Sequence, residues 1–224
     1  SPFHYGKVNH TGYLEISTLI EAYSNYLKSL NSFSNEGFNY TEIEFLDNGI
    51  QYKNIQAKHI IFAEGFGLHA NPYFNDLPLD GTKGELLIIK APNLDLDVVI
   101  KSSVFILPIG NDLYKVGATY DWKDKTNTPT EEGKQELVDK LKEIISCDFE
   151  IVKHFGGVRP TVKDRRPLVG THPEFKQLHV LNGLGTRGVM LGPYLANQLF
   201  QHIENDIPLE KEIDIIRCYK KNRN

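Results

Sequence analysis

The stretch QLHVLNGLGTRGVMLGPYLANQLFQHI, residues 177–203, limits the possible folds of this chain more than any other. An apolar run of strand character leads into Gly183, Gly185 and Gly188, spaced as G-x-G-x-x-G, and an amphipathic helical pattern follows over residues 189–203. This order predicts a strand, a tight turn and a helix. The helix would present free N–H groups and the positive end of its dipole at the turn. The turn can therefore stabilise negative charge on a bound group.

A self-contained dinucleotide site needs more than this turn. It needs a following strand that ends in an acidic residue to hold the ribose, and further strands beyond it. Only residues 212–219, EIDIIRCY, remain to form a strand, while Glu204 and Asp206 lie at the end of the predicted helix. A second match, G-x-G-x-x-A at residues 65–70, follows the apolar strand 60–63, but two prolines shortly afterwards favour a tight turn over a helix. Neither match alone indicates a dinucleotide site, although an NAD-dependent dehydrogenase stays open as an alternative.

The rest of the chain reads as a mixture of helices and short strands. A period of 3.6 residues predicts a helix over 16–30, whose apolar face we expect to pack in a core. Asp47-Asn48-Gly49 is typical of a hairpin turn. Strands separated by Gly110-Asn111-Asp112 suggest an antiparallel meander, and Thr130 is a candidate N-cap for the next helix. Listed in chain order, the remaining predicted elements are strands in 84–92, 97–109 and 112–122, a helix over 131–145, and strands in 149–160 and 212–219.

Composition narrows the class of protein. The net charge is about −4, with 25 basic and 29 acidic residues interspersed, so we expect neither nucleic acid nor a membrane surface as a partner. No apolar stretch approaches the roughly 18 residues that a membrane helix needs. Cys147 and Cys218 are far apart, and the eight histidines lack metal-site spacing, so a cytoplasmic protein without a metal is expected. Ser1 in place of a methionine suggests a piece of a longer polypeptide.

Several separated motifs resemble the FAD-dependent D-amino-acid oxidase, glycine oxidase and sarcosine oxidase superfamily. The block HFGGVRPTVKDRRPLVG, residues 154–170, resembles the family pattern W-A-G-L-R-P-x-T-x-D-x-x-P-x-I-G, and residues 182–193 resemble the glycine turn that follows it. Upstream, AKHIIFAEGF (57–66), GTKGELLII (81–89) and FILPIGNDLYKVGATYDW (105–122) resemble three further family segments in the same order. The similarity runs from about Gly12 to Ile203.

The resemblance implies the fold and the boundaries of its parts. It implies an α+β or α/β fold, in which an antiparallel-sheet substrate domain with flanking helices joins an incomplete, Rossmann-like FAD-binding lobe. Residues 1–67 and 156–224 would belong to the FAD-binding lobe, and residues 68–155 to the substrate domain. The βαβ unit that grips the FAD pyrophosphate in this family would lie outside this chain. We therefore expect the isolated chain to bind FAD weakly or not at all, and to be inactive.

The resemblance also implies a function. The family oxidises the C–N bond of an amino acid or secondary amine by hydride transfer to FAD, and the substrate here would be a small molecule. Arg159 matches the arginine that clamps the substrate carboxylate, which suits a guanidinium because its fork makes two parallel bonds. Tyr120 and Trp122 are candidates for the substrate pocket, with packing in the core or at the surface as the alternative. The candidate cofactor residues are Gly65, Gly183, Leu184, Gly185, Thr186, Arg187, Gly188, Val189 and Met190, of which the backbone amides of 185–189 would face the flavin.

Departures from the family pattern leave alternatives open. Leu184 stands where many members have histidine, and the turn is closer to a G-S-R-G variant, which resembles the oxidase of a bifunctional enzyme that modifies a carboxymethylaminomethyl-uridine in tRNA. Gly157 stands where covalent flavoproteins carry cysteine, so non-covalent FAD is expected. Arg159 could instead pair with an acid such as Asp164, and Asp164 could be structural or catalytic. A binding module that keeps the fold without catalysis is the other alternative.

Overall fold

The computed structural model describes residues 5–219, which divide into two compact units at the boundary between Ile43 and Glu44. The first unit contains helix α1 (Ile16–Ser29) and a short 3-10 helix, η1 (Tyr40–Glu42). The predicted helix is confirmed to within one residue. The expectation that its apolar face packs in a core is wrong, because no residue of α1 is buried: Leu19 is 49% exposed and Ile20 is 59% exposed.

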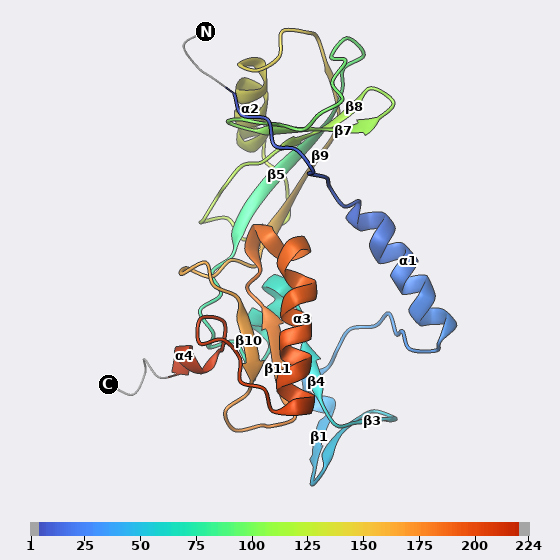
Figure 1. Ribbon diagram of the computed structural model, residues 1–224, viewed down its shortest axis with the longest axis vertical. Coiled ribbons are helices and arrows are strands. Elements are labelled where there is room, and N and C mark those ends of the chain that lie inside the picture. Colours follow the sequence, from blue (N-terminus) through green and yellow to red (C-terminus); the bar gives the residue numbers. More distant parts are fainter. Residues whose placement is uncertain (1–4, 220–224) are drawn as a thin grey trace. The chain divides into compact units, whose positions relative to one another are not determined.

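A five-stranded antiparallel sheet forms the larger part of the second unit (Figure 1). Its strands are β5 (Thr82–Lys90), β6 (Ile100–Lys101), β7 (Phe105–Gly110), β8 (Leu113–Gly117) and β9 (Glu150–Arg159), in the order β6-β7-β8-β5-β9. The predicted meander is confirmed by β6, β7 and β8, which pair in succession. The long strand β5 pairs with both β8 and β9, so it places residues of three chain segments side by side.

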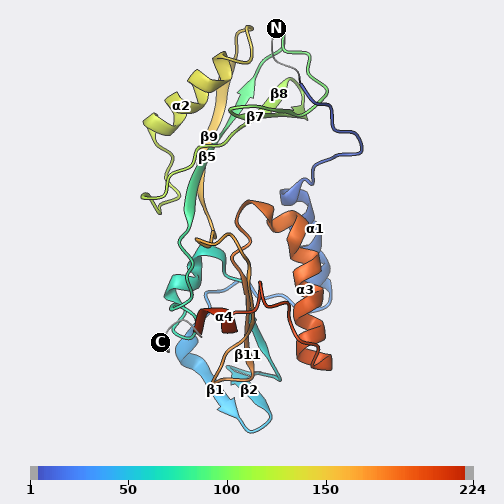
Figure 2. The same ribbon diagram turned by 60° about the vertical axis from the view of Figure 1, so that its left-hand side comes forward.

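Helix α2 (Glu131–Lys142) packs against this sheet, as both ribbon views show (Figure 2). Thr130 is its N-cap, as predicted, and its side-chain oxygen accepts a hydrogen bond from the Gly133 amide at 3.0 Å. The apolar face of α2 buries Leu137 and Leu141 completely. They join a core that also contains Leu87, Ile89, Ala91, Val104, Ile106, Tyr114, Val116 and Ile145.

The same unit contains a second, separate sheet of three strands in the order β10-β11-β4. Its strands are β4 (Ile60–Phe62), β10 (Leu168–Thr171) and β11 (Leu178–Asn182); β11 runs parallel to β4 and antiparallel to β10. Helix α3 (Gly188–Asn205) follows and packs Leu195 and Leu199 onto Val169 of β10. Leu191 and Ile203 are partly buried against the same cluster, so the amphipathic helix predicted over residues 189–203 is confirmed.

Two shorter features match or correct the sequence predictions. The hairpin around Asp47-Asn48-Gly49 is confirmed, with β1 (Ile43–Leu46), β2 (Gly49–Tyr52) and β3 (Ile55–Ala57) forming a small sheet. Residues 65–70 form a 3-10 helix, η2 (Gly65–Ala70), so the prediction of a turn without a helix there is wrong. Gly65, at φ +58°, lets the chain bend from the strand into this helix.

The last predicted strand is also wrong. Residues 212–219 make one isolated bridge, between Val169 and Asp214, and then the helical turn α4 (Ile216–Tyr219). The cause is local: the Asp214 carboxylate accepts a hydrogen bond from the Ile216 amide at 2.9 Å and thereby begins a helix. Apolar alternation there, with Ile213 and Ile215 buried, resembled a strand pattern.

The predicted fold class is confirmed by these sheets and helices. Antiparallel strands flanked by a helix make one part of the unit, and a smaller sheet with a parallel strand pair makes the other. In the described part of the chain no helix is both long and apolar enough to cross a bilayer. The domain boundaries given above stay a prediction.

Candidate functional site

The glycine turn between β11 and α3 depends on two glycines with positive φ. Gly183 lies at φ +71° and Gly185 at φ +55°, where other residues are strained. A Cβ on Gly183 would lie 2.7 Å from Val162 Cγ2, and one on Gly185 would lie 3.2 Å from Thr161 Cγ2. The turn therefore packs directly against the chain that leaves β9. A 3-10 turn, η3 (Gly185–Arg187), connects it to α3.

The amides of this turn divide into occupied and free groups. The Gly185 amide donates to the Pro160 carbonyl at 3.0 Å, and the Arg187 amide donates to the Leu184 carbonyl at 3.1 Å. These two amides are not available to a ligand, which corrects the expectation that every amide of 185–189 is a candidate. The Leu184 and Thr186 amides have no acceptor within the described residues. The N-cap residue Arg187 makes no side-chain cap either, so the start of α3 also lacks side-chain acceptors.

Asn182 connects the late glycine turn to the earlier one. Its side chain is 2% exposed; its amide nitrogen donates to the Gly65 carbonyl at 2.9 Å, and its oxygen accepts from the Gly183 amide at 2.7 Å. The two Gly-rich segments, far apart in sequence, thus lie next to each other at the ends of the parallel strands β4 and β11. Sequence reasoning missed this asparagine.

Arg159, the last residue of β9, is half-buried and has no acidic partner within the described residues. Its Nη1 donates to the carbonyls of Lys83 and Thr119, each at 3.3 Å, and its guanidinium carbon lies 4.6 Å from the centroid of the Tyr120 ring. Nε and Nη2 make no hydrogen bond to the described chain, and neither atom is sealed from solvent. Burial lowers the pKa of Arg159, which still stays charged at neutral pH. One edge of the fork is therefore free for a ligand.

Gly84 on β5 makes room for this guanidinium. A Cβ at Gly84 would overlap the terminal atoms of Arg159. The two residues come from adjacent antiparallel strands, in which Thr82 is opposite Arg159 and Gly84 is opposite Gly157. The need for space around the Arg159 guanidinium thus explains why residue 84 is glycine, which the sequence alone did not show.

A pocket of about 600 Å³ lies between the glycine turn and the segment that follows β8. Residues 183–187 form one side, and Tyr120 and Trp122 contribute aromatic rings that are 63% and 49% exposed. The other lining residues are Thr82, Thr161, Val162 and Arg165. The hydroxyl oxygens of Thr82 and Thr161 lie 2.7 Å apart and share a hydrogen bond. The pocket therefore combines polar groups with exposed rings.

The structure brings many of the predicted site residues together. Tyr120 and Gly183, Leu184, Gly185, Thr186 and Arg187 line the pocket. Arg159 is not itself a lining residue, but it lies against Tyr120. Gly188, Val189 and Met190 begin α3 outside the lining, with Val189 and Met190 exposed, and Gly65 touches the turn through Asn182. The lining residues that sequence reasoning missed are Thr82, Thr161, Val162 and Arg165, which lie in the segments 81–89 and 154–170 that resemble family motifs but were not singled out there.

Asp164 does not pair with Arg159. One of its oxygens accepts from the Arg166 amide at 3.0 Å, and the other lies 3.6 Å from Nε of Arg217. Arg217 in turn donates to four backbone carbonyls, including that of Pro167 at 3.0 Å. Asp164 therefore orders the turn before β10 and holds α4 near it.

Three histidines form a hydrogen-bonded chain with Thr171: His179 is on β11, His59 directly precedes β4, and His202 is on α3. His179 Nε2 lies 3.0 Å from His59 Nδ1, and His179 Nδ1 lies 2.9 Å from the Thr171 hydroxyl, which is 3.2 Å from His202 Nε2. Burial, helped by the two neighbouring histidines, lowers the pKa of His179 to about 4. No group of three His, Cys, Asp or Glu side chains in the described residues could hold a metal ion.

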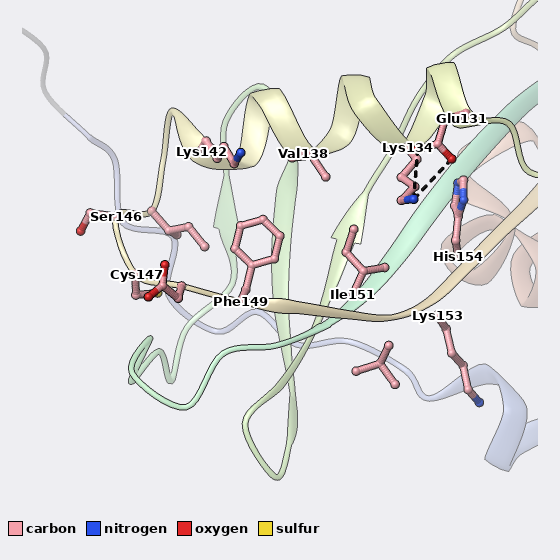
Figure 3. Close-up of a pocket in the computed structure, with 13 residues that line it drawn as sticks. Glu131, Lys134, Val138, Lys142, Ser146, Cys147, Phe149, Ile151, Lys153 and His154 are labelled. Carbon is pink, nitrogen blue, oxygen red and sulfur yellow. Dashed lines mark hydrogen bonds and ion pairs between the residues drawn. The ribbon is translucent and has the colours of Figure 1, made fainter.

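A second hollow, of about 960 Å³, lies between α2 and β9 (Figure 3). Val138, Phe149 and Ile151 point into it, and its charged rim includes the Lys134 and Glu131 pair at 3.1 Å. It contains none of the predicted site residues. Its polar groups do not converge on one point, so the pocket beside Tyr120 is the better candidate site.

Comparisons with known proteins identify relatives of this chain. The model of the family described as FAD dependent oxidoreductase matches residues 35–201. A bifunctional protein of tRNA 5-methylaminomethyl-2-thiouridine biosynthesis from Marinobacter nauticus is 26% identical over 80% of this chain and 31% of its own length. Glycine oxidase from Bacillus subtilis is 24% identical over 72% of this chain and 44% of its own length. The chain thus spans less than half of each relative.

Solved structures show the same fold. Iminodiacetate oxidase from Chelativorans superposes with a TM-score of 0.64 at 22% identity, covering 77% of this chain and 51% of that protein. L-proline dehydrogenase from P. horikoshii superposes with a TM-score of 0.66 at 15% identity, covering 78% of this chain and 51% of that protein. At such low identity these structures support the fold alone.

Proposed function

The chain belongs to the FAD dependent oxidoreductase family, and from this premise we propose that it contributes the substrate site of an enzyme that oxidises the C–N bond of an amino acid or secondary amine. The relatives include a glycine oxidase and a fold neighbour named iminodiacetate oxidase. The observation that carries the proposal is the free Nε and Nη2 edge of Arg159, a half-buried cation without an acidic partner in the described chain. Such an edge matches the two oxygens of a carboxylate.

The residues present fit a non-covalent flavin. The unoccupied amides of Leu184 and Thr186, together with the uncapped start of α3, would stabilise negative charge at the pyrimidine edge of the ring. When bound, FAD would supply the hydride acceptor for the oxidation. Gly157 stands where a cysteine would be needed for a covalent link. Gly65, Gly183 and residues 184–190 stay candidates for cofactor contact.

The chain's own residues would bind and orient the amine. Arg159 would hold the carboxylate through two charge-assisted hydrogen bonds, and the ring of Tyr120, stacked over the guanidinium carbon at 4.6 Å, would help to keep the cation in place. Fixing the carboxylate fixes the carbon next to it, which is the carbon to be oxidised. Because electrons must leave that carbon, the amine must be in its neutral form when it reacts.

Trp122, the one tryptophan of the sequence, gives a direct test, because it lines the pocket. Titration of the chain with sarcosine should change its fluorescence. Arg159→Ala should weaken sarcosine binding by about tenfold or more, since a charge-assisted pair contributes about 1.5–3 kcal/mol. Arg166→Ala, which removes an exposed arginine 3.9 Å from Glu212, should leave the affinity unchanged. Equal affinity of the wild type and Arg159→Ala would reject the carboxylate site.

A substrate amine carried on tRNA is the second candidate function. The relative from Marinobacter nauticus acts in tRNA modification by its name, and the pocket mouth carries Arg165 and Arg187, both exposed. The net charge of −4 argues for the small molecule. Fluorescence anisotropy with a labelled tRNA at low and high salt separates the two. Salt-sensitive binding that Arg165→Ala and Arg187→Ala weaken would favour the tRNA substrate.

We also propose a cytoplasmic location, in line with the two free cysteines.

A further inference from the structure

A buried ionic cluster lies directly behind the Arg159 site. Lys83 of β5 is 1% exposed, and its ammonium group donates to the Asp124 carboxylate at 2.5 Å and to the Thr128 carbonyl. Glu85 of the same strand is 3% exposed, with one oxygen 3.4 Å from Lys83 Nζ. The cluster is defined here as Lys83, Glu85 and Asp124.

Glu85 also contacts the residues at the start of helix α2. Its carboxylate accepts from the Thr130 amide at 3.0 Å and from the Thr130 hydroxyl at 2.8 Å, and it lies 2.7 Å from His154 Nε2. Gly133 has no side chain because a Cβ there would overlap Glu85. A carboxylate at a helix N-terminus is stabilised by the free amides and the dipole. Glu85 therefore ties the end of the 119–130 segment to the sheet.

Together these contacts hold the 119–130 segment at three places. Asp124 and Thr128 are held by Lys83, Thr130 is held by Glu85, and the beginning is held by backbone pairing between Lys83 and Asp121 at 2.8 and 3.0 Å. This segment carries Tyr120 over the guanidinium of Arg159. Lys83 of β5 therefore contacts both the segment and the arginine.

Lys83 has two functions in this arrangement. Its side chain binds the segment, while its backbone carbonyl accepts a hydrogen bond from Arg159. The Thr119 carbonyl accepts the other one, and the Thr119 hydroxyl accepts from the Glu85 amide at 2.9 Å. Any shift of the segment would move both Tyr120 and an acceptor of Arg159.

We propose that Lys83, Glu85 and Asp124 are positioning residues for the carboxylate site, because they fix the 119–130 segment and so set the placement of Tyr120 and of the Arg159 guanidinium. The proposal rests on the proposed function for its ligand, but its structural claim concerns the segment itself. Lys83 links the segment and Arg159, because its side chain binds Asp124 and its backbone carbonyl accepts from Arg159.

The cluster stays ionised at neutral pH. Burial acts to lower the pKa of Lys83, but its hydrogen bonds to Asp124 and Glu85 raise that pKa above the usual value. Burial acts to raise the pKa of Glu85, and the hydrogen bonds from Thr130 lower it below the usual value. The hydrogen bond from Lys83 holds the pKa of Asp124 at about 2. Neutral replacements of these side chains therefore remove charges that are present in the native protein.

The test uses Lys83→Met and Asp124→Asn, with Lys123→Met as the matched control. Lys123 is an exposed lysine of the same segment. Acrylamide quenching of Trp122 reports how well the segment is held, and it needs no ligand. Both cluster variants should raise the quenching constant by about twofold or more as the segment loosens, and Lys123→Met should not. Unchanged quenching in Asp124→Asn, confirmed as folded by circular dichroism, would overturn the proposal even if Lys83→Met fails to fold.

Sarcosine affinity separates positioning from stability. Asp124→Asn should weaken binding by about tenfold, and Asp124→Glu, which keeps the charge, should recover part of it. Leu141→Val, in the fully buried core of α2, should lower Tm without changing affinity. If wild type binds sarcosine and Asp124→Asn binds it equally well, the positioning role is rejected. If wild type does not bind sarcosine, the carboxylate site fails, and the quenching experiment alone decides whether the cluster orders the segment.

Discussion

The guanidinium of Arg159 occupies the space that a side chain on Gly84 would fill, so the strand beside the arginine must carry glycine. The two residues lie on neighbouring strands of one sheet, and the backbone carbonyl next to Gly84, that of Lys83, accepts a hydrogen bond from the same guanidinium. A flat cation lying on bare backbone under the ring of Tyr120 has few alternative positions.

Gly84→Ala should therefore damage ligand binding more than folding. The added methyl group displaces the guanidinium, and sarcosine affinity, followed by Trp122 fluorescence, should fall by about tenfold. Gly157→Ala is the control, because Gly157 is opposite Gly84 in the strand pairing and a Cβ there meets nothing within 4 Å. Equal losses in both variants would mean that the effect comes from strand flexibility and not from Arg159.

Asn182→Ala should destabilise the unit that holds both glycine turns. The change leaves the Gly65 carbonyl and the Gly183 amide without their partner at a buried position, which costs roughly 2 kcal/mol in the free energy of unfolding. Urea denaturation measures the difference. Asn93→Ala, at an exposed turn position, should stay within about 0.5 kcal/mol of the wild type. A loss as small as that control would show that the link between the turns carries little stability.

Acidification should destabilise the protein through His179. The pKa of His179 is lowered from 6.5 to about 4, first by burial and then by the neighbouring charges of His59 and His202. The unfolded chain therefore binds a proton at higher pH than the folded chain does. Stability from this residue is complete above pH 6.5 and is lost as pH falls toward about 4. The expected loss is on the order of 3 kcal/mol.

The measurement compares unfolding free energies of wild type and His179→Asn between neutral and acidic pH. The stability advantage of wild type should shrink as the pH falls through this window. His10→Gln, at an exposed position, should show a constant difference from wild type. A pH-independent difference for His179→Asn would contradict the lowered pKa.

The hydrogen-bond directions in this histidine chain follow from one carbonyl. His202 Nδ1 lies 3.1 Å from the Ile207 carbonyl, which can only accept, so Nδ1 carries the proton. In the neutral chain Thr171 then donates to His202, His179 Nδ1 donates to Thr171, and His59 Nδ1 donates to His179. Nitrogen NMR shifts at neutral pH should show His179 protonated at Nδ1. Protonation at Nε2 would reverse the assigned order.

Asp164→Ala should show whether Asp164 has a structural role or a role in substrate binding, which the sequence left open. Its contacts to the Arg166 amide and to Arg217 are outside the pocket lining, so sarcosine affinity should not change. The free energy of unfolding should fall by about 1 kcal/mol, since Asp164 is half exposed and such pairs are screened by water. A tenfold loss of affinity without a loss of stability would instead place Asp164 in the binding machinery.

Local features of the fold could be predicted well because they depend on neighbouring residues. Thr130 caps α2, Asp47-Asn48-Gly49 makes the hairpin, and the glycines before α3 make the turn. The prediction failed at residues 212–219, where alternating isoleucines indicated a strand. The decisive contact there is the cap from Asp214 to Ile216, and packing of both isoleucines in a bent segment produces the same alternation.

The candidate site could be predicted only in part. A resemblance to known motifs indicated Arg159 and the turn at 183–187, and the structure places Tyr120 at both. It could not indicate which amides of the turn are free, because the acceptor of the Gly185 amide is the Pro160 carbonyl, contributed by another segment. The same holds for Thr82 and Thr161, whose side chains meet across 79 positions.

The sequence by itself determined most of the helices and strands and the glycine turn ahead of α3, because periodicity, capping and turn chemistry act over a few residues. Arg159 was indicated only by resemblance to a family motif. Only the tertiary structure decided that Arg159 lies on Gly84, beneath Tyr120, and in front of a buried lysine that binds Asp124. Those partners are separated by tens of residues, and sheet pairing across β8, β5 and β9 brings them together. The position of the Arg159 cation therefore depends on contacts with Lys83, Thr119 and Tyr120, which no short stretch of sequence contains together with Arg159.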